Sequence, residues 1–131
     1  MVGDSRWVHR PVFDWHQAES RNDLSSIPGR IYHAMLRIAQ IRQQNLAFTR
    51  ADTEIVDSGN AHVFAYFRQH AEQSVLVLAN FSEREQVLAA NRLRLLGLRK
   101  TVTDLMAGRT IIATQSLAVE PYQFMVLLSG R

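Results

Sequence analysis

Cysteine is absent from the 131 residues of this chain. Its absence excludes disulfide bonds, cysteine-ligated zinc sites and thiol catalysis, but it does not identify a compartment. The chain also lacks any run of ~18 apolar residues of the kind that spans a membrane. The residues after Met1 are polar and aromatic, without the apolar segment of a signal peptide. We therefore expect no membrane span and no secretory signal here.

Motifs for catalysis and metal binding are missing as well. The five histidines have no HExxH-type spacing, and no GxSxG, P-loop or GxGxxG segment is present. The acidic residues are scattered, and the sequence nominates no pair for acid–base catalysis, which would need two carboxylates about 5–10 Å apart. We expect no metal, no cofactor and no catalytic residue within this chain.

The charge is mildly basic, with a net value of +3 that comes almost entirely from arginine, since Lys100 is the single lysine. A charge this small is usually a matter of solubility. Leucines, and not stacking aromatic side chains, separate the members of one basic cluster, Arg92, Arg94, Arg99, Lys100 and Arg109. We therefore expect a solvated face there and no nucleic-acid partner.

The most informative stretch is 73–82, QSVLVLANFS. Five consecutive apolar residues, 75–79, predict a strand covered on both faces, at the centre of an antiparallel sheet. Asn80 then begins a turn. Asn80-Phe81-Ser82 matches a glycosylation sequon, a pattern common by chance, and we interpret Phe81 as a core residue.

Hydrophobic residues make up 47% of the chain, which indicates a globular protein. Eight short runs with a period of two predict strands, at 54–57, 62–68, 74–81, 85–90, 100–105, 110–113, 116–119 and 123–128. This pattern favours a mainly β (α+β) fold: an antiparallel β-sandwich of about eight strands, preceded by a loop and one long helix.

That helix is predicted at 28–44, where apolar residues recur near every 3.6 positions. Its apolar stripe consists of Ile31, Met35, Ile38 and Ile41. A single helix has to bury such a stripe against the sheet or against another domain. Upstream, Asp14 followed by Gln17 predicts a capped short helix at about 15–21.

Several segments occur in a telling order: Trp7-Val8-His9-Arg10-Pro11, Asp14-Trp15, Gly29-Arg30-Ile31-Tyr32, Leu78-Ala79-Asn80-Phe81-Ser82, Asp104-Leu105 with Gly108, Leu117, and Pro121-Tyr122-Gln123. Together they resemble the C-terminal end of an amylosucrase, a sucrose-using member of the α-amylase family of glycoside hydrolases. The resemblance runs from Gly3 to Leu128. The NFS turn and the last strand resemble this family generally, whereas the run 4–11 is closer to amylosucrases and sucrose hydrolases.

The resemblance implies that 1–48 closes the catalytic βα barrel of a longer enzyme and that 49–131 is its C-terminal β-sandwich. The parent would transfer glucosyl units from sucrose to α-glucan or water by a retaining double displacement, with its catalytic carboxylates upstream of this chain. The fragment would stabilise the barrel, its partner, and would catalyse nothing alone. By the same resemblance, a bacterial cytoplasmic enzyme is favoured.

One binding residue is carried over from the family. Arg6 stands where amylosucrases have an arginine that pairs with an acid and shapes the sucrose pocket. The planar guanidinium suits this role because it can bond an acid and sugar hydroxyls together. Alternatively, Arg6 only orders its own loop.

Two other function classes remain open. An independent carbohydrate-binding module would need exposed coplanar aromatic rings, and we expect most candidates to lie in strand interiors: Phe64, Tyr66, Phe67, Phe81, Tyr122 and Phe124. An oligomerisation module would need a self-complementary apolar face. In the isolated chain no barrel covers the apolar stripe of the helix at 28–44. We therefore expect the isolated chain to self-associate through this helix.

Overall fold

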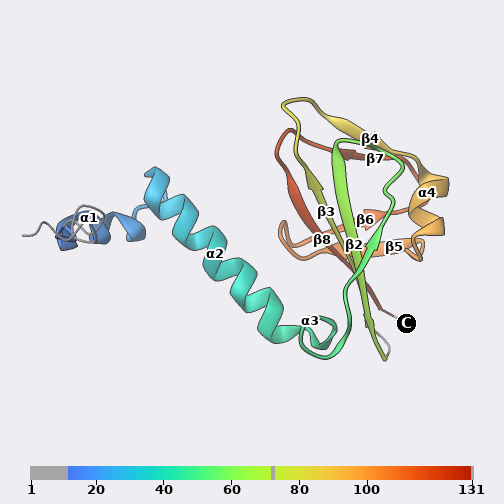
Figure 1. Cartoon of the computed structure of the whole chain (residues 1–131), viewed down its shortest axis with the longest axis horizontal. Coiled ribbons are helices and arrows are strands. Elements are labelled where there is room, and N and C mark those ends of the chain that lie inside the picture. Colours follow the sequence, from blue (N-terminus) through green and yellow to red (C-terminus); the bar gives the residue numbers. More distant parts are fainter. Residues whose placement is uncertain (1–11, 72, 131) are drawn as a thin grey trace, which may run out of the picture. The chain divides into compact units, whose positions relative to one another are not determined.

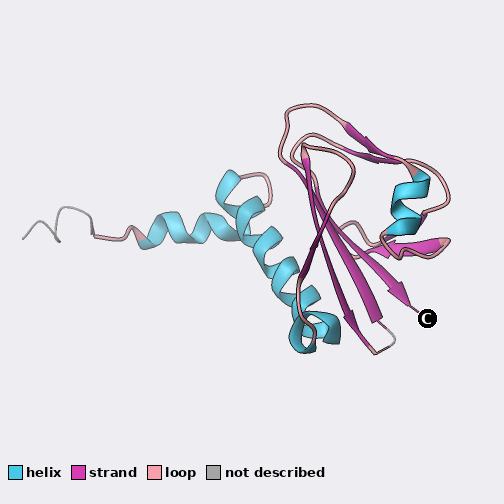
Figure 2. Cartoon of the chain, turned by 45° about the vertical axis from the view of Figure 1, so that its right-hand side comes forward, coloured by secondary structure: helices cyan, strands magenta, loops and turns pink. Residues whose placement is uncertain are grey.

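The computed structural model describes residues 12–71 and 73–130. The chain forms two compact units, the first ending at Arg37 and the second beginning at Ile38. Figure 1 labels the elements along the chain, and Figure 2 separates helices from strands. The predicted boundary between the end of the barrel, 1–48, and the β-sandwich, 49–131, stays a prediction. In the described ranges, no helix combines the length and apolar character needed to cross a membrane.

The first unit begins with the short helix that the sequence predicts. Helix α1 spans Trp15–Glu19, and the 3₁₀ turn η2 follows at Ser20–Asn22. Asp14 caps α1, because its carboxylate accepts a hydrogen bond from the backbone N–H of His16 at 2.9 Å. The N-cap that the sequence predicts is therefore present.

The long helix α2 spans Ile27–Gln44, one residue longer than predicted. The Ser26 hydroxyl accepts a hydrogen bond from the Gly29 N–H at 3.0 Å at its start. A Cβ atom on Gly29 would overlap the carbonyl oxygen of Asp23, so only glycine fits there. The hydroxyl and backbone N–H of Ser25 hold the pKa of Asp23 below its ordinary value.

All eight predicted strands are present in the second unit. They are β1 (Glu54–Val56), β2 (Val63–His70), β3 (Gln73–Asn80), β4 (Gln86–Leu88), β5 (Thr101–Asp104), β6 (Arg109–Ile112), β7 (Leu117–Val119) and β8 (Phe124–Gly130). Six form one antiparallel sheet in the order β1-β2-β3-β8-β5-β6, and β4 pairs with β7. This is the β-sandwich that the sequence predicts.

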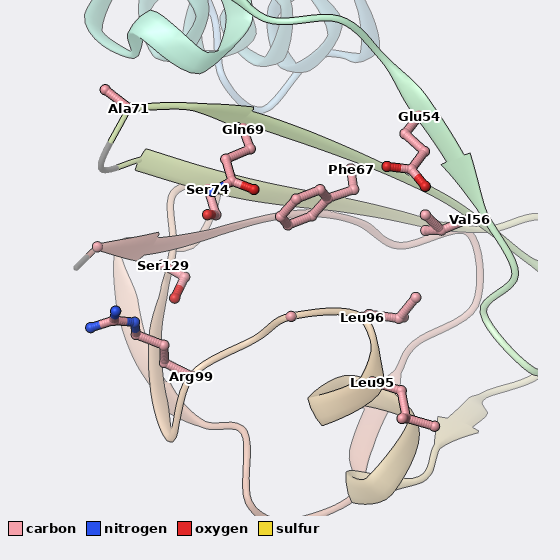
Figure 3. A pocket seen from close by; sticks show the side chains of 12 residues that line it. Glu54, Val56, Phe67, Gln69, Ala71, Ser74, Leu95, Leu96, Arg99 and Ser129 are labelled. Atoms are coloured by element: carbon pink, nitrogen blue, oxygen red, sulfur yellow. The ribbon is translucent and has the colours of Figure 1, made fainter.

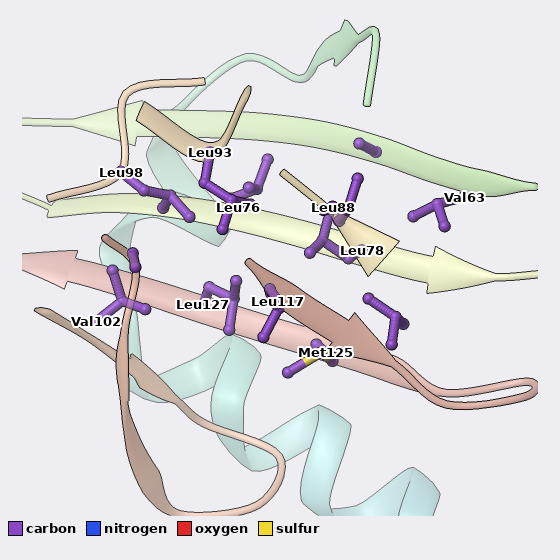
Figure 4. Close-up of a cluster of buried hydrophobic side chains, with 13 residues drawn as sticks. Val63, Leu76, Leu78, Leu88, Leu93, Leu98, Val102, Leu117, Met125 and Leu127 are labelled. Atoms are coloured by element: carbon purple, nitrogen blue, oxygen red, sulfur yellow. The ribbon is translucent and has the colours of Figure 1, made fainter. Parts of the chain in front are cut away.

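Strand β3 has the central position expected for it, hydrogen-bonded to β2 on one side and β8 on the other. Its side chains enter two different cores. Leu76 and Leu78 belong to the inner core, between the large sheet and the β4–β7 pair with helix α4 (Figure 4). Val75 and Val77 belong to a second cluster, which we call the outer core and which also contains Ile41, Ala47 and Val126. Burial on both faces explains why this strand is apolar at every position from 75 to 79.

The sequence did not predict two short helices. Helix α3 spans Leu46–Arg50, and helix α4 spans Ala90–Leu95, where the sequence predicts the end of strand 85–90. Helix α4 lacks a side-chain cap at Ala89 and is held by Leu93, which is fully buried in the inner core. Tertiary packing forms this helix, and a six-residue run has too little periodicity to reveal it.

Arg68 on β2 fixes helix α3 to the sheet. Its guanidinium donates hydrogen bonds to the Ala47 carbonyl at 2.8 Å and to the Thr53 hydroxyl at 2.6 Å, and also bonds the Ala51 carbonyl. The guanidinium thus accepts no bond but donates to one carbonyl within α3, that of Ala47, and to one just after its end, that of Ala51. Ile41, near the end of α2, packs with Ala47 in the outer core.

Candidate functional site

The binding residue expected from the sequence, Arg6, lies outside the described residues, so its role stays a prediction. Within 12–71 and 73–130, no group of three or more His, Asp or Glu could hold a metal ion.

One member of the basic cluster, Arg92, is paired with an acid, whereas Arg94, Arg99 and Lys100 line one pocket together. Arg92 forms an ion pair with Asp57 at 2.6 Å and also donates to the Asp57 carbonyl at 2.9 Å. These bonds tie α4 to the loop after β1. Arg92 therefore has a structural role, and the expectation that this chain has no nucleic-acid partner stays a prediction.

An exposed aromatic cluster corrects two of our predictions. Phe81 is 74% exposed and is not a core residue. Phe64 and Tyr122 are exposed too, so half of the six aromatic residues expected in strand interiors reach solvent. We call Phe64, Phe81 and Tyr122 the aromatic surface. Their turns lie side by side, because the Phe81 N–H bonds the carbonyl of His62, two residues before Phe64, and the Tyr122 N–H bonds the Ser82 carbonyl.

Asn80 explains why Phe81 points outward. Asn80 is buried, and its amide nitrogen donates to the carbonyls of Arg84, Val119 and Glu120 at 2.8–3.1 Å. Its oxygen accepts from the backbone N–H and the hydroxyl of Ser82. The apparent sequon is thus a structural turn whose asparagine is inaccessible for glycosylation in the folded domain. Phe81 follows β3 and projects to the opposite side of the chain from Asn80, where it belongs to neither core.

Tyr122 lies in the turn between β7 and β8 and has a left-handed backbone conformation, with φ of +56°. This conformation is uncommon for a bulky residue. The sequence contained a usable signal for both exposed rings, since Phe81 follows a turn-forming Asn80 and Tyr122 follows Pro121. Aromatic residues in turns need not enter a core.

A second apolar surface lies on helix α2. Ile41 is only 4% exposed, whereas Met35 is 66% exposed, and Ile31 and Ile38 are also exposed. The predicted stripe is thus buried at its last position and open at the other three. We call Ile31, Met35 and Ile38 the open stripe.

Comparisons with known proteins identify relatives of both the sequence and the fold. The family model described as the cyclomaltodextrinase C-terminal domain matches residues 59–128. A glucan 1,6-α-glucosidase of Streptococcus pneumoniae serotype 4 is 31% identical over 91 residues, which is 70% of this chain and 16% of that protein.

Two solved structures share the fold at lower identity. A trehalose-6-phosphate hydrolase of Bacillus licheniformis superposes with a TM-score of 0.63 at 20% identity, covering 87% of this chain and 20% of that one. An Anoxybacillus α-amylase gives 0.63 at 12% identity, covering 77% and 22%. The chain thus has the C-terminal β-sandwich fold of α-amylase-type enzymes, and it spans less than a quarter of the length of each relative.

Proposed function

This chain belongs to the family of cyclomaltodextrinase C-terminal domains, within the α-amylase family of glycoside hydrolases, and we propose that it stabilises the catalytic barrel of such an enzyme. The observation that carries the proposal is the open stripe on α2. Its residues are exposed, while Ile41 on the same helix face is buried against the sandwich. A helix with large apolar residues in water needs a partner. The barrel of the parent enzyme is the partner that fits this position in the family.

The finer proposal concerns the substrate. We propose that the parent is amylosucrase-like and transfers glucosyl units from sucrose to α-glucan or water by a retaining double displacement. The support is the resemblance of the run 4–11, with Arg6 in the sucrose pocket and the catalytic carboxylates outside this chain. The chain alone then has no catalytic role.

An activity assay tests that role. The 131-residue chain is incubated with sucrose, and release of glucose and fructose is followed against a no-protein control. We expect no release above the control, because the reaction needs two carboxylates across one cleft. Clear turnover would contradict the accessory role.

Association of the isolated chain tests the open stripe. Each large apolar side chain is worth about 1.5–3 kcal/mol on full burial, so three together can drive pairing of two helices when the barrel is absent. Sedimentation at micromolar concentration should show a dimer or larger oligomer. Met35→Glu and Ile38→Glu should each shift it toward the monomer, because association would bury an unpaired charge.

The matched control is Gln40→Glu, which adds the same charge on the side of α2 opposite Ile38. It should leave the oligomer intact. A wild-type monomer, or an oligomer that withstands the changes at Met35 and Ile38, would refute the role of the stripe in association.

The aromatic surface favours a second candidate function, carbohydrate binding. Exposed rings held by rigid turns can stack on sugar faces, and Phe64 and Phe81 line one shallow cavity of about 280 Å³. In this case Phe81→Ala and Tyr122→Ala should weaken retention on insoluble starch while leaving the thermal midpoint of unfolding nearly unchanged. Unchanged retention in both variants would remove this candidate.

A further inference from the structure

A separate cleft opens at the other end of the sandwich, near the β2–β3 hairpin. Its volume is about 400 Å³, which lies in the range of about 300–1,000 Å³ typical of small-molecule sites. The inner face of the large sheet forms one wall, and the segment from α4 to β5 forms the other (Figure 3). None of the aromatic surface contributes to it.

The floor of the cleft is polar where the rest of the inner face is apolar. Ser74 and Ser129 are paired across β3 and β8, and Gln69 is paired with Ser74 from β2. Ser129 is only 3% exposed, yet its hydroxyl forms no hydrogen bond with any residue that the structure describes. The Ser129 hydroxyl is not among the fully buried unpartnered side-chain atoms of the described residues, so it is accessible from the cleft. It can therefore bond water or a ligand there.

The rim and side wall supply complementary groups. Figure 3 shows Glu54, Phe67 and Gln69 directed into the same space. Phe67 is half-buried, and Gly97, at φ of +82°, lies close to the edge of its ring. Arg99 completes the rim. Within the described ranges, neither Glu54 nor Arg99 forms an ion pair.

The chemistry of these groups selects a class of ligand. The lining contains one acid and one base, Glu54 and Arg99, so it has no net formal charge and does not favour an anion or a cation. Serine hydroxyls and the Gln69 amide both donate and accept hydrogen bonds, as the hydroxyls of a polyol require. The Phe67 ring offers an apolar surface beside them. A neutral saccharide combines vicinal hydroxyls with an apolar C–H face, and it matches all of these groups.

We propose that this cleft binds a glucosyl unit of a neutral saccharide, with Ser129 and Arg99 as hydrogen-bonding residues and Phe67 as the apolar wall. The choice of a glucosyl unit rests on the proposed function, which places the chain in a glucan-acting enzyme. The site would hold substrate or product on the accessory domain, outside the catalytic barrel.

The test titrates maltotriose into the 131-residue chain and follows backbone and side-chain amides by NMR. A few hydrogen bonds and one ring give a dissociation constant on the order of millimolar, so titration to about 10 mM nearly fills the site. The signals of Gln69, Ser74 and Ser129 should move in a saturable way. Arg99→Ala and Ser129→Ala should each raise the dissociation constant at least about fivefold, as expected for loss of one hydrogen bond.

The matched control for Arg99→Ala is Arg109→Ala, which removes the same charge from an exposed position outside the cleft. It should bind as the wild type does. Arg99 is exposed, so its variant keeps the test valid even if Ser129→Ala alters folding.

Signals that do not move overturn the proposal. Binding that is insensitive to Arg99→Ala but lost on Phe81→Ala also overturns it, since the saccharide then binds the aromatic surface. Sedimentation tests the role of the open stripe separately, so the two proposals can fail independently.

Discussion

Replacing Asn80 by alanine is the sharpest test of how this domain holds its turns together. The Asn80 side chain joins the turn at 80–84 to the end of β7. Its nitrogen donates to the carbonyls of Arg84, Val119 and Glu120, and its oxygen accepts two bonds from Ser82. Asn80→Ala removes all of these bonds and leaves buried carbonyls without donors.

The magnitude follows from the bonding capacity of the amide. The nitrogen has two hydrogens, so its three contacts amount to two full donations, and the oxygen accepts two more. Four bonds at about 1 kcal/mol each give a loss of roughly 3–5 kcal/mol in the free energy of unfolding. For a chain of this size, that loss lowers the thermal midpoint by roughly 10–20 °C.

Thermal and urea unfolding, followed by circular dichroism, measure the effect. Asn80→Asp should cost at least as much as Asn80→Ala at neutral pH, because a carboxylate oxygen would then face three carbonyl oxygens. Asn60→Ala is the matched control. The Asn60 side chain makes two bonds, from its nitrogen to the Gln86 side chain at 2.9 Å and from the His62 backbone N–H to its oxygen at 2.9 Å. This change removes half as many bonds and should cost clearly less. A loss below about 1 kcal/mol for Asn80→Ala, or an aspartate variant more stable than the alanine one, would refute the reasoning.

Three further predictions concern Arg68 on β2, Gly29 at the start of α2, and Arg6. Arg68→Met should lower the free energy of unfolding by about 2 kcal/mol through lost charged hydrogen bonds, with the exposed Arg50→Met as a near-neutral control in urea titrations. Gly29→Ala should open the start of α2, because its methyl group overlaps the Asp23 carbonyl; unchanged amide exchange at the helix start would contradict this. In the full-length enzyme, Arg6→Ala should lower sucrose turnover by at least ~10-fold if the side chain bonds the sugar, and unchanged kinetics would remove it from the pocket.

The sequence by itself determined the elements whose periodicity is strong. Eight alternating runs gave eight strands, and the continuous apolar run of 75–79 gave the central one, since burial on two faces removes the need for polar positions. The cap at Asp14 and the start of α2 also followed from local chemistry, because their hydrogen bonds join residues only two or three positions apart. Local signals of this kind act before any tertiary contact forms.

Only the tertiary structure decided the features that depend on distant partners. Helix α4 forms because Leu93 reaches the core, and Asn80 is buried because its side chain bonds carbonyls some 40 positions away, while Phe81 beside it is exposed. The cleft likewise combines strand ends with the segment after α4, and a row of polar residues such as Ser74 and Ser129 becomes a floor only when β3 and β8 pair. Spacing along one segment carries no information about such long-range pairing, whose free energy arises only when the whole sandwich closes.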